Sequence, residues 1–384
     1  MRLSRLFIQF FNSEKAGGVI LLLCAVVSIL LANSSLHTEY ISLWKYEIAG
    51  QHFDHWINDG LMVIFFLLIG LELRREVYIG ELSDLKSAVL PIFAALGGML
   101  LPAGIHLMFN YGTISQAGAG IPMATDIAFA LGVLSLLGNR VPASLKIFLT
   151  AFAIIDDLGA IITIAIFYSK GLSIFNLGTA LGIFLLLGVL NKLKVKSLIV
   201  YLLGGVALWY FMLHSGVHPT IAGVLLAFVI PYDKDDKKSP SYYLQHFLHK
   251  PVSFIILPLF ALANTAIRTT ASFSNIFSMP NSRGIFFGLF LGKPVGIFLF
   301  SLLAVSLGIC TKGEELKWKY LIGLGLLGGI GFTMSVFISL LAFDDGALIN
   351  ASKIAIILTS AVAAVCGLIV LGITLPKVSK VSMT

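Results

Sequence analysis

The sequence predicts an all-α membrane protein that crosses the bilayer about twelve times, with two of the crossing helices interrupted. Of its 384 residues, 58% are hydrophobic and only 12% are charged, whereas soluble domains are about 25% charged. Apolar stretches of about 20 residues, long enough to cross the hydrocarbon core, recur along the chain. Glycine and proline interrupt two of these stretches. An ordinary soluble protein is therefore excluded.

Cutting the chain where charged and turn-forming residues cluster gives the expected spans in order. Their approximate ranges are 14–33, 56–78, 87–109, 119–138, 143–168, 172–190, 197–213, 216–231, 251–270, 284–309, 320–343 and 353–375. The first apolar run follows Arg2 and Arg5 and superficially resembles a signal peptide. Because the run is long for one and further spans follow, we interpret it as a retained first helix.

The fourth and eleventh spans carry helix-breaking residues. Pro122, Thr125 and Asp126 lie in the middle of 119–138, and five glycines fall within 323–331 of the eleventh span. Such interruptions predict discontinuous helices, which direct half-helix ends toward the middle of the membrane. For the glycines, the alternative is close packing of uninterrupted helices through small residues.

The distribution of basic residues predicts the orientation. If the N-terminus is cytoplasmic, 20 of the 26 Lys and Arg residues lie in cytoplasmic segments and 5 in outer loops, while Lys293 lies within a span. Both termini are therefore predicted to be cytoplasmic. The net charge of +7 then faces anionic lipid. No continuous basic stripe is left for nucleic acid, so a nucleic-acid partner is not expected.

Two polar breaks are long enough to hold structure outside the membrane. The segment Tyr40-Ile-Ser-Leu-Trp-Lys-Tyr-Glu-Ile is partly alternating and rich in aromatic and β-branched residues, which predicts a small external β-hairpin at about 40–53. The break at 231–250 has six charged residues in a row from Asp233, which predicts a solvated connector. The three cysteines are far apart and support neither a disulfide framework nor a zinc site.

Ionisable residues at membrane depth are costly and are candidates for function. The second span cannot cross without including Asp59, Glu72 or Glu76. For these three acids an interfacial position, reaching water or pairing with Arg74 or Arg75, is an equally good interpretation.

Four further ionisable residues lie in the middle of their spans: Asp126, Asp156, Asp157 and Lys293. Successive helical residues point about 100° apart, so Asp156 and Asp157 need different partners. One carboxylate can pair with Lys293 while the other faces a water-filled cavity. Asp126 can compensate the positive half-helix ends, and Lys293 the negative ones. A carboxylate that holds either a proton or a cation is in itself an exchanger of the two.

Motifs for other chemistry are weak. A GxGxxG match at 323–328 lies inside a span without a βαβ unit, and the glycines of 288–294 are too closely spaced for a P-loop. Paired intramembrane aspartates also suggest a protease, but that chemistry needs a dyad sharing one proton and leaves Lys293 without a role. Neither an enzyme activity nor a cofactor is predicted.

Several segments, in the same order along nearly the whole chain, closely resemble the NhaA family of sodium/proton antiporters. They are Ser13-Glu-Lys-Ala-Gly-Gly18, His55-Trp-Ile-Asn-Asp59, Phe65-Phe-Leu-Leu-Ile-Gly-Leu-Glu-Leu-Arg-Arg-Glu76, Ala124-Thr-Asp-Ile-Ala-Phe-Ala-Leu-Gly132, Ile154-Ile-Asp-Asp-Leu-Gly-Ala160, Ser215-Gly-Val-His218, Leu257-Pro-Leu-Phe-Ala261, Gly292-Lys-Pro294 and Gly331-Phe-Thr-Met-Ser335.

The resemblance implies roles for the buried charges. Asp157 becomes the principal ligand of the transported cation, and Asp156 pairs with Lys293 in the proton-coupled switch. Thr125 and Asp126 belong to the crossing of the broken helices, with Asp126 near the cation. The resemblance further implies inverted repeats at about 87–168 and 284–375 within a single transporter domain, 1–384. It also implies a homodimer that contacts through the external hairpin.

The resemblance also implies a response to pH. Glu72, Glu76, His218, His246 and His249 fall in regions that the family uses for pH response at the cytoplasmic side. The residue before His246 is Gln245, where the enterobacterial pattern has a glutamate, which changes the expected pH threshold.

Two pairs of histidines also have spacings that need an interpretation. The spacings of His214 with His218 and of His246 with His249 would also suit a metal. Without a convergent acid, they favour protonatable or structural histidines.

The predicted function is therefore electrogenic, pH-regulated exchange of cytoplasmic Na⁺ (or Li⁺) for external protons, by alternating access around Asp157, in a bacterial inner membrane. Its partners are those ions, membrane lipid and a second copy of the chain. The main alternative is a passive cation channel, which would use the same acids without opposite proton flow. An intramembrane protease and a purely structural scaffold are weaker alternatives, and the scaffold leaves the buried charges unexplained.

Overall fold

The computed structural model describes residues 14–233, 239–268, 277–313 and 315–376, which are mostly helical. The chain divides into two compact units. The first comprises Met1–Leu22, Asp84–Asp156 and Thr270–Thr384, and the second Leu23–Ser83 and Asp157–Thr269. One boundary falls inside α8 (Ala143–Phe167), between Asp156 and Asp157, and another inside α2 (Glu14–Ala32).

Among the described residues, seven helices are long and apolar enough to cross a membrane, or nine if each bent helix pair counts as one span. The bent pairs are Ile114–Met123 with Ile127–Ser135, at 43°, and Trp318–Gly328 with Phe332–Ala342, at 48°. These are the two spans in which helix-breaking residues predicted discontinuous helices, so that prediction is confirmed. A polytopic helical membrane protein is likewise confirmed, whereas the count of twelve spans stays a prediction.

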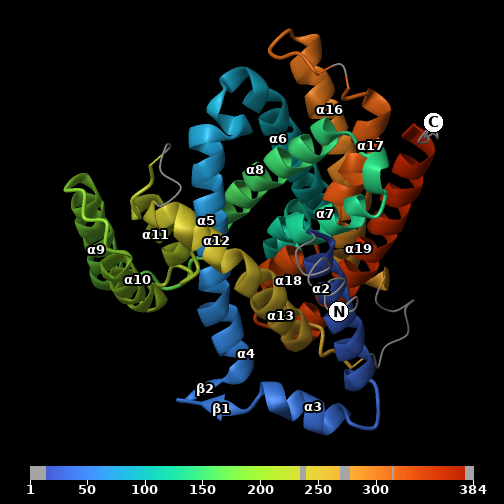
Figure 1. Ribbon diagram of the computed structural model, residues 1–384. Coiled ribbons are helices and arrows are strands. Elements are labelled where there is room, and N and C mark those ends of the chain that lie inside the picture. Colours follow the sequence, from blue (N-terminus) through green and yellow to red (C-terminus); the bar gives the residue numbers. More distant parts are fainter. Residues whose placement is uncertain (1–13, 234–238, 269–276, 314, 377–384) are drawn as a thin grey trace, which may run out of the picture. The chain divides into compact units, whose positions relative to one another are not determined.

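The first unit contains both bent pairs (Figure 1). Its elements are α6 (Leu85–Asn110), η3 (Ile114–Met123), α7 (Ile127–Ser135), η4 (Gly138–Arg140), α15 (Pro280–Phe287), η6 (Gly288–Gly292), α16 (Lys293–Ser306), α17 (Trp318–Gly328), α18 (Phe332–Ala342), α19 (Gly346–Thr374) and the start of α8. Helices α6 and α16 pack closely because Gly97 and Gly296 face each other, and a Cβ on either would overlap the other's carbonyl. Helix α17 packs between α16 and α19.

The second unit is built around α5. Its elements are α3 (His37–Trp44), β1 (Glu47–Ile48), β2 (Gln51–His52), α4 (Phe53–His55), η1 (Trp56–Leu61), α5 (Met62–Ile79), η2 (Glu81–Ser83), α9 (Ile174–Lys192), α10 (Leu198–Leu213), α11 (Ile221–Val229), α12 (Pro240–Pro251), η5 (Val252–Ile256) and α13 (Leu257–Asn264). Helix α11 approaches α5 closely at Gly223, where a Cβ would overlap the Val63 carbonyl. Helices α9 and α10 pair side by side (Figure 1).

The predicted β-hairpin at 40–53 is only partly correct. Two-residue strands pair antiparallel, with Glu47 opposite His52, but the segment before them is the helix α3. Tyr40 and Trp44 are one helical turn apart, and their rings pack edge to face at 5.8 Å between centroids. The Tyr40 hydroxyl also donates to Ser28 Oγ. A buried contact on one helical face therefore overrides the alternating pattern.

The predicted connector at 231–250 is also shorter than expected. Residues 234–238 lie outside the described residues, but Pro240 begins α12, which continues through one π-turn into α13. A proline in the first turn of a helix removes no hydrogen bond, and Leu244 and Leu248, four residues apart, are both buried. The charged residues at the start of this break favoured a connector, although the residues that follow them form an amphipathic helix.

Candidate functional site

Asp126 lies where the two interrupted helices of the first unit meet, and its carboxylate caps both. Its Oδ1 accepts from the Phe129 backbone N–H at 3.0 Å, at the start of α7. Its Oδ2 accepts from the Thr333 backbone N–H at 3.1 Å and the Thr333 hydroxyl at 2.5 Å, at the start of α18. Helix N-termini present unsatisfied N–H groups and a positive partial charge. One buried carboxylate therefore satisfies two half-helix N-termini.

The opposite half-helix ends are satisfied by hydroxyl and amide donors. The Thr125 hydroxyl donates to the Gly328 carbonyl at 2.7 Å, at the end of α17. The Ser335 hydroxyl donates to the Ile121 carbonyl at 2.7 Å, within η3. The Asp126 backbone N–H donates to the Ile330 carbonyl, also at 2.7 Å. Each break is thus bonded to the other, which stabilises a non-helical backbone inside an apolar protein.

Lys293 begins α16 and is fully buried. Its ammonium contacts both carboxylate oxygens of Asp156, at 2.8 and 3.0 Å, and donates to the Met123 carbonyl at the end of η3. Asp156 is fully buried as well. Removing either partner would leave a buried charge uncompensated, at a cost of about 3–5 kcal/mol. The lysine therefore joins a carboxylate of α8 to a C-terminal end of an interrupted helix.

Asp157 follows Asp156 in α8, and it is 2% exposed. Successive residues on a helix point about 100° apart, so the Asp157 and Asp156 carboxylates point in different directions. Both acids are therefore buried, and the water-filled cavity expected beside one of them stays a prediction.

Glu72 and Glu76 lie in the C-terminal half of α5. Glu76 is buried and pairs with Arg75 at 2.8 Å, while Glu72 is half-buried. Next to them, Arg74 donates to the Ala227 and Ile230 carbonyls at the end of α11. The pairing with Arg75 considered for Glu76 is therefore observed, whereas its position at the membrane interface stays a prediction.

His246 and His249 lie on α12 and are exposed. Gln245, the residue before His246, is buried. Helix α12 starts beside the C-terminal end of α11, because the Ser241 N–H donates to the Pro231 carbonyl at 3.1 Å. Both histidines therefore lie on a helix that starts at the same end of α5 as Glu76.

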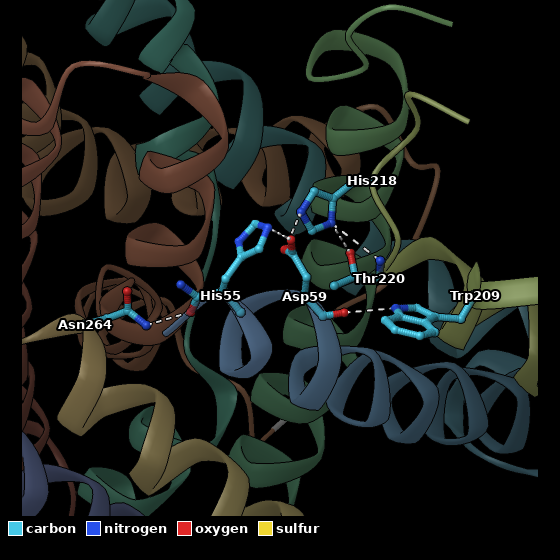
Figure 2. A network of polar contacts seen from close by, with 7 residues as sticks. His55, Asp59, Trp209, His218, Thr220 and Asn264 are labelled. Carbon is cyan, nitrogen blue, oxygen red and sulfur yellow. Dashed lines mark hydrogen bonds and ion pairs between the residues drawn. The ribbon is translucent and has the colours of Figure 1, made fainter. Parts of the chain in front are cut away.

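His218 lies elsewhere in the second unit (Figure 2). Its Nε2 is 3.4 Å from Asp59 Oδ1, and His55 Nε2 is 3.2 Å from Asp59 Oδ2. Asp59 stands in η1, before the start of α5. It is separated from Glu76 by about 25 Å at 1.5 Å per helical residue. The five candidates for pH response therefore form two groups at opposite ends of α5, because the loop before α11 returns His218 to the N-terminal end.

Hydrogen-bonding residues other than the predicted ones complete both polar sites. Thr333 and Ser335 lie in the segment 331–335 that resembles the family, but no role was predicted for either residue. Ser360 Oγ accepts from the Phe332 N–H at 3.1 Å. In the second unit, Trp209 Nε1 donates to the Asp59 carbonyl at 3.0 Å. A hydroxyl residue just after a glycine break, in a span that must pair with a buried acid, is a signal that sequence reasoning could have used. Ser360 gives no such signal, because its partner lies on another helix.

No group of three or more His, Cys, Asp or Glu side chains that could hold a resident metal occurs in the part of the chain that the structure describes. The site consists of buried charges around two interrupted helices, an arrangement typical of secondary transporters. The chain also matches the family model described as Na⁺/H⁺ antiporter 1 over residues 8–371, and it belongs to that family.

Relatives named Na⁺/H⁺ antiporter NhaA support this assignment. The Flavobacterium psychrophilum protein is 60% identical over 96% of both chains. The Cytophaga hutchinsonii protein is 60% identical over 98% of this chain and 97% of its own. The Yersinia enterocolitica protein is 50% identical over 96% of this chain and 97% of its own.

Proposed function

We propose that this protein exchanges cytoplasmic Na⁺, or Li⁺, for external protons by alternating access around Asp157. The observation that carries the proposal is the fully buried ion pair between Lys293 and Asp156, which lies beside two bonded helix breaks. Intramembrane charges are retained at high cost and mark ion pathways. The names of the relatives support sodium and protons as the substrates.

The coupling follows from what a buried carboxylate can hold. Na⁺ is a hard cation that prefers carboxylate and carbonyl oxygens, so it binds the deprotonated form of Asp157. A proton on the same oxygens displaces it, which makes the two occupants mutually exclusive. When Asp156 takes a proton, its attraction to Lys293 is lost, so protonation also loosens the contact between α8 and α16. Two titrating carboxylates against one monovalent cation would make the exchange electrogenic.

The helix breaks supply a fixed frame for this chemistry. Asp126 balances the positive ends of α7 and α18, and Lys293 the negative end of η3. Thr125 holds the two breaks together through the Gly328 carbonyl. We assign to Asp126 and Thr125 a position near the transported cation.

The proposed setting is a bacterial inner membrane. It comprises about twelve spans, cytoplasmic termini and inverted repeats at about 87–168 and 284–375, in contact with lipid. The two-residue strands β1 and β2 are exposed on every residue, which leaves them available for pairing with a second copy of the chain. We therefore propose a homodimer formed through this hairpin.

For pH regulation we propose two groups instead of one. Glu72, Glu76, His246 and His249 would act at one end of α5, and His218 with Asp59 at the other. Gln245, which does not titrate, stands where the enterobacterial pattern has a glutamate, so we expect a pH threshold that differs from that pattern.

Everted vesicles with a pre-formed pH gradient test the proposal. Added Na⁺ should collapse the gradient in vesicles with the wild-type protein, and Asp157→Asn should abolish the response, since a neutral amide cannot alternate between proton and cation. The matched control is Asp84→Asn, which neutralises an exposed acid that caps α6. Na⁺ flux without proton movement at any pH from about 6 to 9 would instead support a cation channel.

A further inference from the structure

Two pockets of the second unit adjoin each other. One, of about 290 Å³, lies among α5, α10 and α11, and the other, of about 280 Å³, lies at the N-terminal end of α5. Gly60 and Trp209 line both pockets. The two pockets therefore meet at Gly60 and Trp209, and together they are called the cleft; neither is lined by Asp156, Asp157 or Lys293.

The first pocket is apolar along its length. Val63, Ile64 and Leu67 of α5 line it together with Val206 of α10. From Gly60 to Leu67 it extends about 10 Å along the helix axis. Val206 is 62% exposed, so the pocket opens on the surface that faces hydrocarbon in a membrane. A peptide is a poor occupant here, because its backbone groups would find no hydrogen-bond partners at this depth.

The second pocket is lined by the Asp59 carboxylate and the side chains of Gln51, His55 and His214. Figure 2 shows the carboxylate between His55 and His218, whose ring nitrogens each contact one of its two oxygens. Each carboxylate oxygen has a second lone pair that can accept from a further donor. His214 Nδ1 contacts the Tyr210 carbonyl at 2.9 Å, so in the neutral ring Nδ1 carries the proton and Nε2 is an acceptor.

The indoles of Trp56 and Trp209 also line this pocket, and Trp209 lies at the junction with the apolar one. Tryptophan concentrates at the boundary between hydrocarbon and headgroups. The cleft therefore changes from apolar to polar at the level where a lipid changes from acyl chain to headgroup.

We propose that this cleft binds one phospholipid whose headgroup carries a primary ammonium. One acyl chain lies against Val63, Ile64 and Leu67, and the ammonium donates its three N–H groups to Asp59 and the neighbouring acceptors. An anionic headgroup would bring its charge toward Asp59, and a quaternary ammonium has no N–H to donate. The proposal rests on the placement of the chain in a membrane, and it does not depend on ion exchange.

Gly60 provides the decisive variant. A Cβ on Gly60 would have only the Trp56 ring within 4 Å, at 3.7 Å, so a side chain fits there and projects into the junction of the two pockets. Gly60→Leu should fold, since leucine favours a helical position over glycine. Gly60→Ala leaves most of the junction open. Gly182→Leu, at an uncrowded position of α9, controls for an added leucine elsewhere in the same unit.

The experiment measures thermal unfolding of the delipidated full-length protein while phosphatidylethanolamine, phosphatidylcholine or phosphatidylglycerol with identical acyl chains is added. We expect phosphatidylethanolamine to raise the melting temperature most. Gly60→Leu should weaken its apparent affinity at least about tenfold, because each buried methylene contributes about fourfold. Gly60→Ala and Gly182→Leu should respond as the wild type does.

Two results would overturn the proposal. An unchanged response in Gly60→Leu would exclude the cleft, and equal shifts with all three lipids would exclude the ammonium headgroup. Because the readout is lipid-dependent unfolding, a failure here differs from a failure of the proposed exchange, which the vesicle assay reports on its own.

Discussion

Thr333 donates both its backbone N–H and its hydroxyl to one carboxylate oxygen of Asp126, at 3.1 and 2.5 Å. The other oxygen of Asp126 caps α7, so Thr333 fixes the second interrupted helix to the carboxylate that already caps the first. Both side chains are 2% exposed. The mutual position of the two helix breaks therefore depends in part on a hydroxyl that is not itself charged.

Thr333→Val should destabilise the protein, because it keeps the side-chain shape and removes the shorter donor. Hydrogen bonds to charged groups contribute about 1.5–3 kcal/mol, so a loss of that order is expected in the free energy of unfolding. Chemical denaturation in detergent measures it. Thr333→Ser retains the hydroxyl and should recover most of the loss. If valine destabilises the protein no more than serine does, the hydroxyl is not the group on which this contact depends.

Lys293→Ala should destabilise the protein by about 3–5 kcal/mol, because Asp156 is left buried without its cation. Thermal unfolding in detergent at neutral pH reports the effect. The double variant Lys293→Met with Asp156→Leu removes both charges and should unfold at a temperature much closer to the wild type, although it should not transport. If Lys293→Ala unfolds at the same temperature as the wild type, the ion pair does not contribute to stability.

The sequence was sufficient for the class of fold because the relevant forces are local. Hydropathy and run length identify the spans, and glycine, proline and Asp126 in two of them predicted breaks at the places where the helices bend. Asp156, Asp157 and Lys293 were singled out because charge is costly in an apolar span, and all three are buried.

Contacts between distant segments could not be predicted in the same way. His218 approaches Asp59 only because α11 folds back along α5. The sequence around either residue does not predict this contact. The α3 helix formed because Tyr40 and Trp44 pack together, where alternation alone suggested a strand. Ser360 lies outside any motif, and only its position on α19 brings it to the start of α18.

A second network of the first unit was not predicted at all. His106 of α6 lies 3.1 Å from Asn281 Oδ1 on α15, and Asn281 Nδ2 donates to Ser352 Oγ on α19 at 2.7 Å. Because the amide nitrogen of Asn281 faces the serine, its oxygen accepts from His106, which places the ring proton on Nε2. All three residues are at most 1% exposed.

His106→Phe should lower the free energy of unfolding by about 1–3 kcal/mol, the cost of leaving the buried Asn281 oxygen without its donor. A double-mutant cycle tests this. His106→Phe combined with Asn281→Leu should cost less than the sum of the two single changes, since neither partner then remains unsatisfied. Additive losses would mean that the two side chains do not interact in the folded protein.

The close approach of α6 and α16 at Gly97 gives a test of packing. Gly97→Ala should destabilise the contact of α6 with α16, because its Cβ would overlap the Gly296 carbonyl and neither backbone can move away without disturbing the other. The expected loss is about 1–3 kcal/mol, typical of overpacking. Gly104→Ala, on the same helix but with nothing within 4 Å of its Cβ, should instead gain up to about 1 kcal/mol from helix propensity. Thermal unfolding of both variants side by side gives opposite signs if the α6–α16 contact is as close as described, and equal signs would contradict it.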